Sequence, residues 1–164
     1  ITNATDDQLK VIANVCKKHM NVPAVDFTDE AAERVFVSMP MNEQKCDCVA
    51  VIRKGINTAL KNTGNKPFFL DKAIHSENIY NVMLENIHNC KFLVADLTTQ
   101  NLGVYYEAGY AKALGKTVIF TCKDSDLKNI HFDIKQVQTI GWKDESELSE
   151  ELAKQICGLS LGKR

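Results

Sequence analysis

The sequence predicts an α/β fold, a three-layer α/β/α sandwich around a five-stranded parallel sheet of the flavodoxin/Rossmann-like type. The first observation behind this prediction is an alternation along the chain. Short apolar runs that favour strands are followed by longer segments whose apolar residues recur every three or four positions. The second is that prolines and glycines stand between these segments, where turns are needed. Such alternation is typical of βαβ units, whose right-handed crossovers place helices on both faces of a parallel sheet.

Five runs supply the strands. The first ends at Pro40, as expected where a buried strand enters a loop, and the third ends at Asp96. The expected strands cover residues 35–39, 67–70, 91–95, 117–121 and 137–140. Five strands in βαβ units suggest a flavodoxin-like order.

Helical spacing separates these runs. Gly64 and Gly115 follow two of the expected helices, and Ser76 and Asp144 are candidate N-caps of two others. The expected helices cover residues 5–20, 46–62, 76–89, 103–114 and 145–157. Ligands of such sheets bind beyond the carboxyl ends of the strands. The segments to inspect are therefore residues 38–42, 71–76, 96–107 and 122–133.

Length and charge exclude several classes of protein. The chain has 164 residues, which fits one domain, and a hydrophobic content of 45% argues against global disorder. A net charge of −1 argues against a protein that binds a nucleic-acid polymer through its phosphates. We expect a helical appendage or linker over residues 1–34 and one α/β domain over residues 35–164. Because residue 1 is Ile rather than Met, we also expect a fragment of a longer chain.

The six cysteines indicate a reducing compartment. Four lie in periodic apolar segments, where a free Cys behaves as a small hydrophobic residue, and disulfide frameworks belong mainly to shorter secreted chains. Cys46 and Cys48 are one residue apart, whereas paired zinc ligands usually have about two to four residues between them. The sequence contains no signal peptide or apolar run of membrane length. We expect a cytoplasmic protein with no metal, no cofactor and no membrane contact.

Candidate chemistry is concentrated in residues 94–111. Asp96 ends a buried strand, a polar loop follows, and a helix begins near Gly103 with Glu107 in its first turns. The helix macrodipole favours a carboxylate at this end by roughly 0.3–1 kcal/mol, which keeps Glu107 ionised as a nucleophile or electrostatic stabiliser requires. Gly103 lets backbone N–H groups approach a ligand, and free N–H groups at a helix start attract phosphate.

A structural interpretation of the same segment stays open. Asp96 also fits a strand-end residue that caps the loop, and Glu107 a solvated helix residue. Small residues at Ala108, Gly109 and Ala111 favour the functional interpretation, because they let the helix pack closely on the sheet. Gly109 within a helix costs about 1 kcal/mol relative to Ala, which indicates a tight approach at that position.

Residues 95–116 carry a family resemblance. The matching positions are Ala95-Asp96-Leu97-Thr98, Asn101, Val104-Tyr105-Tyr106-Glu107-Ala108-Gly109-Tyr110-Ala111 and Ala113-Leu114-Gly115-Lys116. This pattern resembles the nucleoside 2-deoxyribosyltransferase-like superfamily, above all its TIR-like nucleotide-binding branch, and is similar to the 2'-deoxynucleoside 5'-phosphate N-hydrolases. Residues 35–40 resemble the family's first strand and substrate loop. Residues 131–134 resemble its Pro-Phe-Asp segment, with His in place of Pro. The resemblance covers residues 35–143.

The resemblance implies cleavage or transfer at the N-glycosidic bond of a nucleoside or nucleotide. By position, Glu107 would be the nucleophile at the anomeric carbon, and Asp96 would hold the sugar hydroxyls or the leaving base. The carboxylate would also stabilise an oxocarbenium-like transition state. The implied substrate-binding residues are Ser38, Met39, Pro40, Asp71, Asn101, Gly103 and Tyr106. Family members often form homo-oligomers, so we expect a homodimer or a larger homo-oligomer.

Two departures from the family pattern keep other functions open. The N-hydrolases carry an acidic residue in the region of 81–83 and a glycine-rich first loop, and this chain has neither, with Asp71 as the substitute acid. One alternative is a TIR-like domain of a larger signalling or defence protein that hydrolyses NAD or senses a nucleotide. Another is a catalytically silent nucleotide-binding or oligomerisation module. We expect surface roles for His75 and His131 and a packing role for Trp142.

Overall fold

The computed structural model describes residues 33–70 and 79–162. Its centre is a sheet of five parallel strands in the order β2-β1-β3-β4-β5, which is the flavodoxin-like order. The strands are β1 (Arg34–Ser38), β2 (Lys66–Phe69), β3 (Phe92–Asp96), β4 (Val118–Lys123) and β5 (Thr139–Trp142). The predicted fold class and strand order are confirmed.

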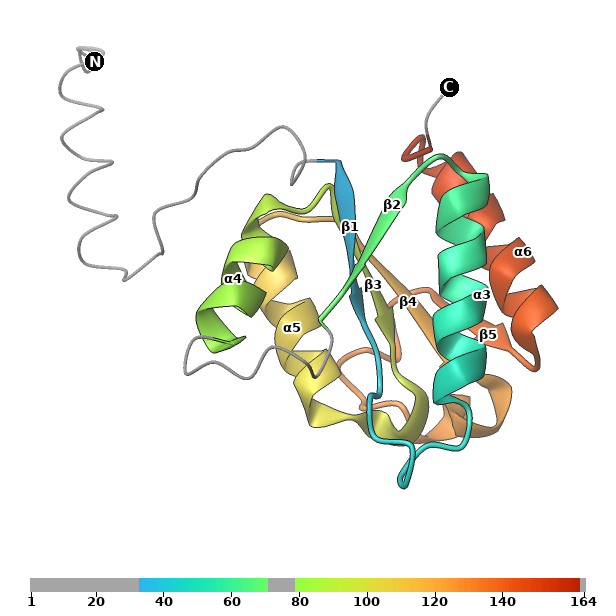
Figure 1. Ribbon diagram of the computed structural model, residues 1–164. Coiled ribbons are helices and arrows are strands. Elements are labelled where there is room, and N and C mark those ends of the chain that lie inside the picture. Colours follow the sequence, from blue (N-terminus) through green and yellow to red (C-terminus); the bar gives the residue numbers. More distant parts are fainter. Residues whose placement is uncertain (1–32, 71–78, 163–164) are drawn as a thin grey trace, which may run out of the picture.

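Helices cover both faces of this sheet. The α-helices of the described residues are α3 (Val49–Asn62), α4 (Ile79–Asn89), α5 (Leu102–Ala113) and α6 (Glu145–Gly158). α3 and α6 lie on one face and α4 and α5 on the other, which gives the three predicted layers (Figure 1). Short 3₁₀ helices η1 (Thr98–Gln100) and η2 (Asp124–Asn129) follow β3 and β4. The helix expected over residues 5–20 lies outside the described residues.

Each face of the sheet has its own hydrophobic core, because side chains alternate along a strand. In β1, Val35 and Val37 pack with residues of α3 and α6, whereas Phe36 packs with residues of α4 and α5. All residues of β3 are buried, as expected for a central strand that is covered on both sides. The buried strands are therefore continuous apolar runs in the sequence rather than alternations of apolar and polar residues.

A close approach between helices occurs at Gly55 of α3. A Cβ atom at this position would lie 2.8 Å from Cδ2 of Leu148 in α6, so a larger residue would push the two helices apart. The tight approach predicted at Gly109 of α5 is wrong. Gly109 is exposed, and an added Cβ atom would meet nothing within 4 Å. Its neighbours Ala108 and Ala111 are buried, as is Val104, and pack in the core beneath the helix.

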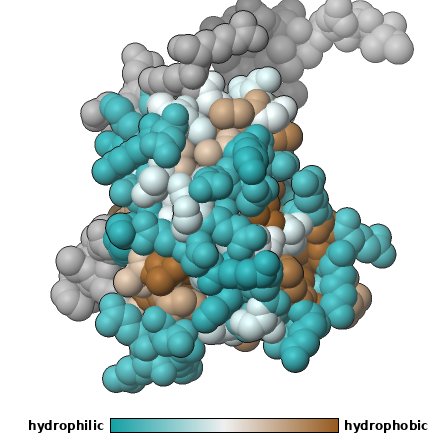
Figure 2. Space-filling model, turned by 90° about the vertical axis from the view of Figure 1, so that its right-hand side faces the viewer, coloured by the Kyte–Doolittle hydropathy of each residue, from teal (hydrophilic) through white to brown (hydrophobic). Residues whose placement is uncertain are grey.

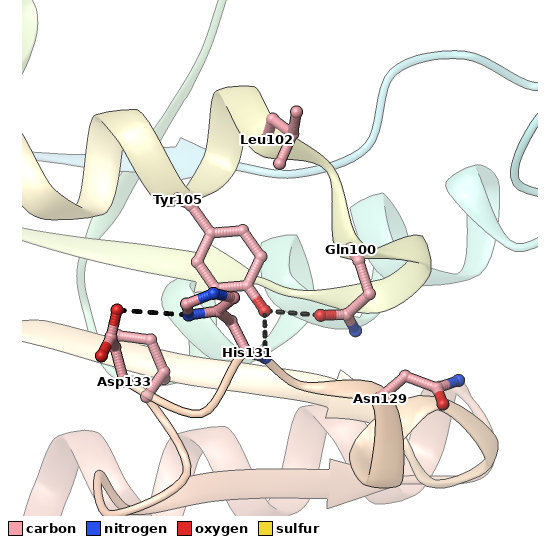
Figure 3. A pocket seen from close by; sticks show the side chains of 7 residues that line it. Gln100, Leu102, Tyr105, Asn129, His131 and Asp133 are labelled. Carbon is pink, nitrogen blue, oxygen red and sulfur yellow. Dashed lines mark hydrogen bonds and ion pairs between the residues drawn. The ribbon is translucent and has the colours of Figure 1, made fainter.

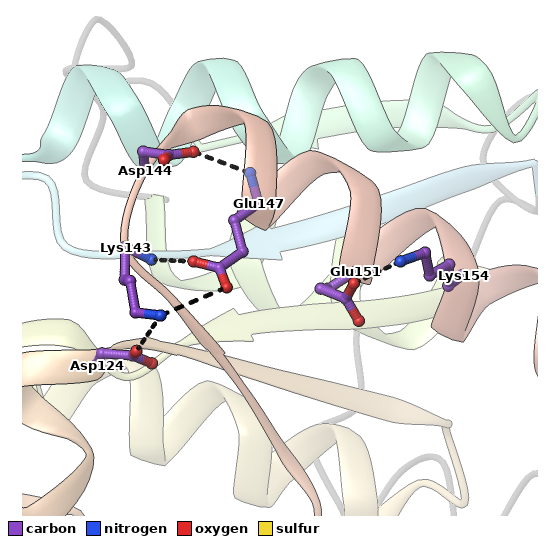
Figure 4. Close-up of polar contacts among 6 residues, drawn as sticks. All are labelled: Asp124, Lys143, Asp144, Glu147, Glu151 and Lys154. Atoms are coloured by element: carbon purple, nitrogen blue, oxygen red, sulfur yellow. Dashed lines mark hydrogen bonds and ion pairs between the residues drawn. The ribbon is translucent and has the colours of Figure 1, made fainter.

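The start of α6 illustrates how local sequence fixes an element. Asp144, the predicted cap, accepts a hydrogen bond from the backbone N–H of Glu147 at 2.9 Å. The Glu147 carboxylate accepts one from the backbone N–H of Lys143, also at 2.9 Å, which closes a reciprocal pair (Figure 4). A cap of this kind contributes about 1 kcal/mol. Lys143 Nζ lies 3.8 Å from Oδ2 of Asp124, which links the start of α6 to η2.

The outer surface of the α3 and α6 layer is polar. Figure 2 shows this side of the molecule mostly covered by hydrophilic side chains, with hydrophobic atoms in the hollows between them. Large apolar side chains that are exposed lie mainly elsewhere: Ile79, Tyr80, Leu102, Tyr106, Phe132 and Leu159. Within the described ranges, none of the helices has the length and apolar character needed to cross a membrane.

Among the described residues, the predicted starts of two elements differ from the structure by more than one residue. The strand expected over residues 137–140 begins at Thr139, because Val137 belongs to a turn in which its N–H bonds the carbonyl oxygen of Ile134 at 2.8 Å. The side chains of Ile134 and Val137 pack against the core from this loop, so the loop resembles a strand in its composition. The helix expected from residue 46 begins at residue 49, after a turn.

Candidate active site

The carboxyl edge of the sheet brings the predicted segments together. β1 ends at Ser38 and β3 ends at Asp96, and Ser38 is paired with Ala95 in the register of these neighbouring strands. α5 begins directly after the loop that leaves β3. Residues from β1, β3 and α5 can therefore meet at the edge where sheets of this kind bind ligands.

Glu107 of α5 is joined to this edge by a hydrogen bond. The buried hydroxyl of Ser38 donates to Oε2 of the Glu107 carboxylate. Within the described residues, Ser38 is the only group that donates a hydrogen bond to this carboxylate. Burial raises the pKa of Glu107 above its ordinary value, and the Ser38 hydrogen bond lowers it only in part. This direction is opposite to the one expected from the helix start, because desolvation disfavours the charged form.

Asp96 is placed quite differently. Its side chain is 0% exposed. Oδ1 accepts the backbone N–H of Thr98 at 3.0 Å, and Oδ2 accepts the hydroxyl of Thr121 at 2.6 Å and the indole N–H of Trp142 at 3.0 Å. Burial raises the pKa of Asp96, although these hydrogen bonds oppose the shift. The carboxylate thus joins the ends of β3, β4 and β5, and no part of it lies open to a substrate.

The loop between β3 and α5 has a rare backbone conformation. Thr99 and Gln100 have φ angles of +62° and +54°, a region that residues with a branched or long side chain seldom adopt. Each residue in this region costs on the order of 1–3 kcal/mol. Two hydrogen bonds hold the loop: Thr99 N–H to Oδ2 of Asp126 at 2.8 Å, and Lys123 N–H to Oγ1 of Thr98 at 3.0 Å. β4 and η2 therefore fix the path that leads into α5.

Asn101 and Gly103 form the start of α5. Asn101 is the N-cap, and its side-chain oxygen accepts the Gly103 N–H at 2.9 Å. The Gly103 N–H is therefore already hydrogen-bonded to the cap residue two positions earlier. A role of this helix start in binding phosphate stays a prediction.

Predicted residues nevertheless gather around a pocket of about 390 Å³. Pro40, Asn101 and Gly103 line it together with Lys45. Lys45 was not singled out from the sequence, although it is the one basic residue in the loop after β1. Its ammonium group suits an anionic part of a ligand. Met39 is buried in the core under α3 and α6, so it can meet a ligand only through its backbone.

Tyr106 lies at the surface beside Tyr80 of α4. Their hydroxyl oxygens are 2.6 Å apart, and both side chains are about half exposed. The hydrogen bond from Tyr80 raises the pKa of Tyr106. Asp71 and His75, two further residues that the sequence places near the site, lie outside the described residues.

Comparison with known proteins assigns the family. The sequence model of the nucleoside 2-deoxyribosyltransferases matches residues 3–146, which is most of the chain. The chain belongs to the nucleoside 2-deoxyribosyltransferase family. The match extends beyond the resemblance over residues 35–143 and includes residues 3–34. No curated protein matches the sequence.

A solved structure shows that this nucleoside 2-deoxyribosyltransferase family member shares its fold with an N-glycosidase. The CMP N-glycosidase BcmB of Clostridium botulinum is 22% identical to this chain, with a TM-score of 0.57. The similarity covers 74% of this chain and 98% of that one. At 22% identity, this similarity shows that the two proteins share a fold.

Two cysteines of this family member lie side by side in the loop before α3. Cys46 and Cys48 bring their sulfur atoms within 3.1 Å of each other, and both are buried, free thiols. Burial raises the pKa of Cys48 to about 12, so it is a neutral thiol. In residues 33–70 and 79–162, no group of three or more His, Cys, Asp and Glu side chains is arranged to hold a metal ion.

Proposed function

We propose that the chain cleaves the N-glycosidic bond of a nucleoside or nucleotide, with the Glu107 carboxylate as the nucleophile. The observation that carries this proposal is the hydrogen bond between Ser38 and Glu107. It holds a carboxylate at the edge where ligands bind in sheets of this kind. Membership of the nucleoside 2-deoxyribosyltransferase family supports the same class of reaction.

In the first step, Oε1 of Glu107 attacks the anomeric carbon, and the bond from this carbon to the base nitrogen breaks. The bonding electron pair leaves with the base, which takes a proton from solvent. A glycosyl ester of Glu107 remains. Because the Ser38 hydroxyl holds Oε2, Oε1 is oriented before the substrate arrives. The negative charge also stabilises the oxocarbenium-like transition state.

In the second step, water or a second base attacks the same carbon and displaces the carboxylate. Water gives the free sugar, whereas a base gives a new nucleoside, and in both cases the attacking group releases a proton to solvent. Glu107 must be ionised to attack, and burial raises its pKa. The rate should therefore rise with pH through this raised pKa.

The Lys45 pocket favours a substrate that carries an anionic group. Lys45 lines it with Pro40 and the residues at the start of α5, where the helix macrodipole adds positive potential. A sugar 5'-phosphate fits this charge. BcmB, which has a similar fold, is named as a CMP N-glycosidase, and CMP carries such a phosphate. We therefore expect nucleoside 5'-monophosphates to react faster than nucleosides.

The test compares the wild-type protein with Glu107→Ala on deoxynucleosides, their 5'-monophosphates and NAD. Free base is followed by chromatography. We expect the wild type to release base at least about 10³-fold faster than the variant, because the variant lacks the nucleophile. Addition of a second free base separates transfer, which yields a new nucleoside, from hydrolysis.

A matched control is Glu150→Ala, which removes an exposed glutamate of α6 and should leave the rate unchanged. Release of base from NAD alone would favour the TIR-like alternative. Inactivity of the wild type on the whole panel, with nucleotide binding retained, would favour a catalytically silent nucleotide-binding module. Equal rates in the wild type and Glu107→Ala would exclude Glu107 as the nucleophile.

A further inference from the structure

A second pocket lies on the side of α5 away from Glu107. Tyr105 lines this pocket, and residues two positions apart on a helix point in directions about 200° apart. The pocket has a volume of about 460 Å³ and lies between the start of α5 and the loop after η2 (Figure 3). This size falls in the range of small-molecule sites, roughly 300–1,000 Å³.

One wall of this pocket is held in place by hydrogen bonds. The hydroxyl of Tyr105 donates to Oε1 of Gln100 at 2.5 Å and accepts the backbone N–H of His131 at 3.2 Å (Figure 3). Nε2 of Gln100 donates to the carbonyl oxygen of Leu97 at 3.1 Å. The wall is therefore formed before any ligand binds, which reduces the entropy that binding costs.

Two polar groups remain available at the pocket. Asn129 is exposed, and its side-chain amide has no hydrogen-bond partner among the residues described. Nδ1 of His131 lies 3.3 Å from Oδ2 of Asp133, which favours a proton on Nδ1 and leaves Nε2 of the neutral ring as an acceptor (Figure 3). An amide offers a donor and an acceptor side by side, and this pattern matches the hydrogen-bonding edge of a nucleobase.

Apart from the exposed Asp133 carboxylate, the rest of the pocket is apolar and aromatic. Leu102 is 82% exposed and lines the pocket with Ile134. The rings of Tyr105 and His131 lie edge to face with centroids 6.4 Å apart, and the Phe132 ring lies 4.5 Å from that of His131. A flat ring that covers Leu102 removes apolar surface from water and contacts this aromatic group.

We propose that this pocket binds a nucleobase, free or within a nucleoside, at a site separate from Glu107. The ring lies against Leu102 and Ile134, and its polar edge is bound by Asn129 and His131. Only the choice of a nucleobase over another flat heterocycle rests on the proposed function, in which a base is released. Gln100 and Leu102 also line the Lys45 pocket, so a base bound here contacts residues of both sites.

The test is isothermal titration of the full chain with adenine and with cytosine. We expect saturable binding of one base with the same Kd in the wild type and in Glu107→Ala. Asn129→Ala and His131→Ala should each weaken this binding about tenfold, because each removes one hydrogen-bonding group. Gln136→Ala removes an exposed amide of the same loop that does not line the pocket, so it should bind as the wild type does.

Three results would overturn the proposal: no saturable binding of either base, loss of binding in Glu107→Ala, or equal affinity in Asn129→Ala and Gln136→Ala. Affinity that falls as the protein dimerises would also overturn it, because a second copy would then cover the pocket. Both altered residues are exposed, and an unchanged thermal midpoint verifies that the variants are folded. Base binding without any N-glycosidase activity would reject the proposed function alone and leave this site intact.

Discussion

Asp96 and Glu107 lie at the same edge of the sheet, but their carboxylates have different surroundings. Asp96 is fully buried, and donors from three segments of the chain bind it. Glu107 is partly exposed, and within the described part of the chain it accepts a hydrogen bond only from Ser38. Burial raises the pKa of both. A raised pKa therefore does not separate the proposed nucleophile from a structural carboxylate, whereas the number of hydrogen-bond donors around each group differs clearly.

The resemblance to the family implies a role in substrate binding for Asp96. Its surroundings favour a different role, in which it fixes the ends of β3, β4 and β5 relative to one another. Glu107 depends on this arrangement indirectly, because the loop after Asp96 leads into its helix. The two interpretations of Asp96 predict different losses when it is replaced.

We expect Asp96→Ala to lower the free energy of unfolding by roughly 3 kcal/mol or more, because it leaves the Thr121 hydroxyl and the Trp142 indole N–H buried without an acceptor. Urea denaturation measures this loss. Glu107→Gln is the control, and it should change the free energy of unfolding by less than about 1 kcal/mol. Equal urea midpoints for Asp96→Ala and the wild type would contradict the structural role.

Urea denaturation of Asp96→Asn and the wild type at several pH values tests the effect of the Asp96 charge on stability. Burial raises the pKa of Asp96 in the folded protein above its value in the unfolded chain. The contribution of this group to the free energy of unfolding is therefore fully present below the unfolded pKa. It is lost as the pH rises through the folded pKa. The Asn variant lacks this loss. Its stability relative to the wild type should therefore increase with pH across that window.

The next effect concerns the pH dependence of activity. Ser38→Ala removes the hydrogen bond that lowers the pKa of Glu107, so the acidic limb of the rate profile should move to higher pH. At a pH on the acidic limb, we expect Ser38→Ala to react roughly tenfold more slowly than the wild type. Ser149→Ala, in α6, is a matched control at another buried serine and should not move the limb. A limb that stays in place after Ser38→Ala would show that Glu107 does not govern it.

The smallest effect is expected at Tyr106. Its hydroxyl is exposed and already hydrogen-bonded to Tyr80, so Tyr106→Phe should change KM by no more than about twofold. Tyr80→Phe should have an equally small effect. A KM that rises tenfold in Tyr106→Phe but not in Tyr80→Phe would restore the role in substrate binding that the resemblance implies.

The fold could be predicted because each layer leaves a local signal in the sequence. The buried strands are apolar runs, the helices have their own spacing, and Asp144 marks the start of α6. The signal failed where a loop is as apolar as a strand, as at Val137, whose side chain packs in the core from the turn before β5. It also failed at Gly109, because composition does not reveal which face of a helix meets solvent.

The site could be predicted only in part, because its contacts join residues that are far apart in the sequence. Glu107 and the loop before it stand in one recognisable segment. Its donor Ser38 is 69 residues away, and Trp142 is 46 residues from Asp96. No spacing rule connects such positions, since the order of the strands brings them together. Both walls of the Asn129 and His131 pocket belong to segments that the sequence marks for inspection, but no local signal shows that these two segments face each other.

The hydrogen bond from Trp142 to Asp96 also provides a spectroscopic reporter. The chain has one tryptophan, which is 1% exposed, so its fluorescence comes from a single buried indole. That indole touches a titratable carboxylate at the carboxyl edge of the sheet. Its emission therefore follows the charge of Asp96 in the folded protein and the entry of water into the sheet on unfolding. Changes at this edge can be observed without attaching a dye.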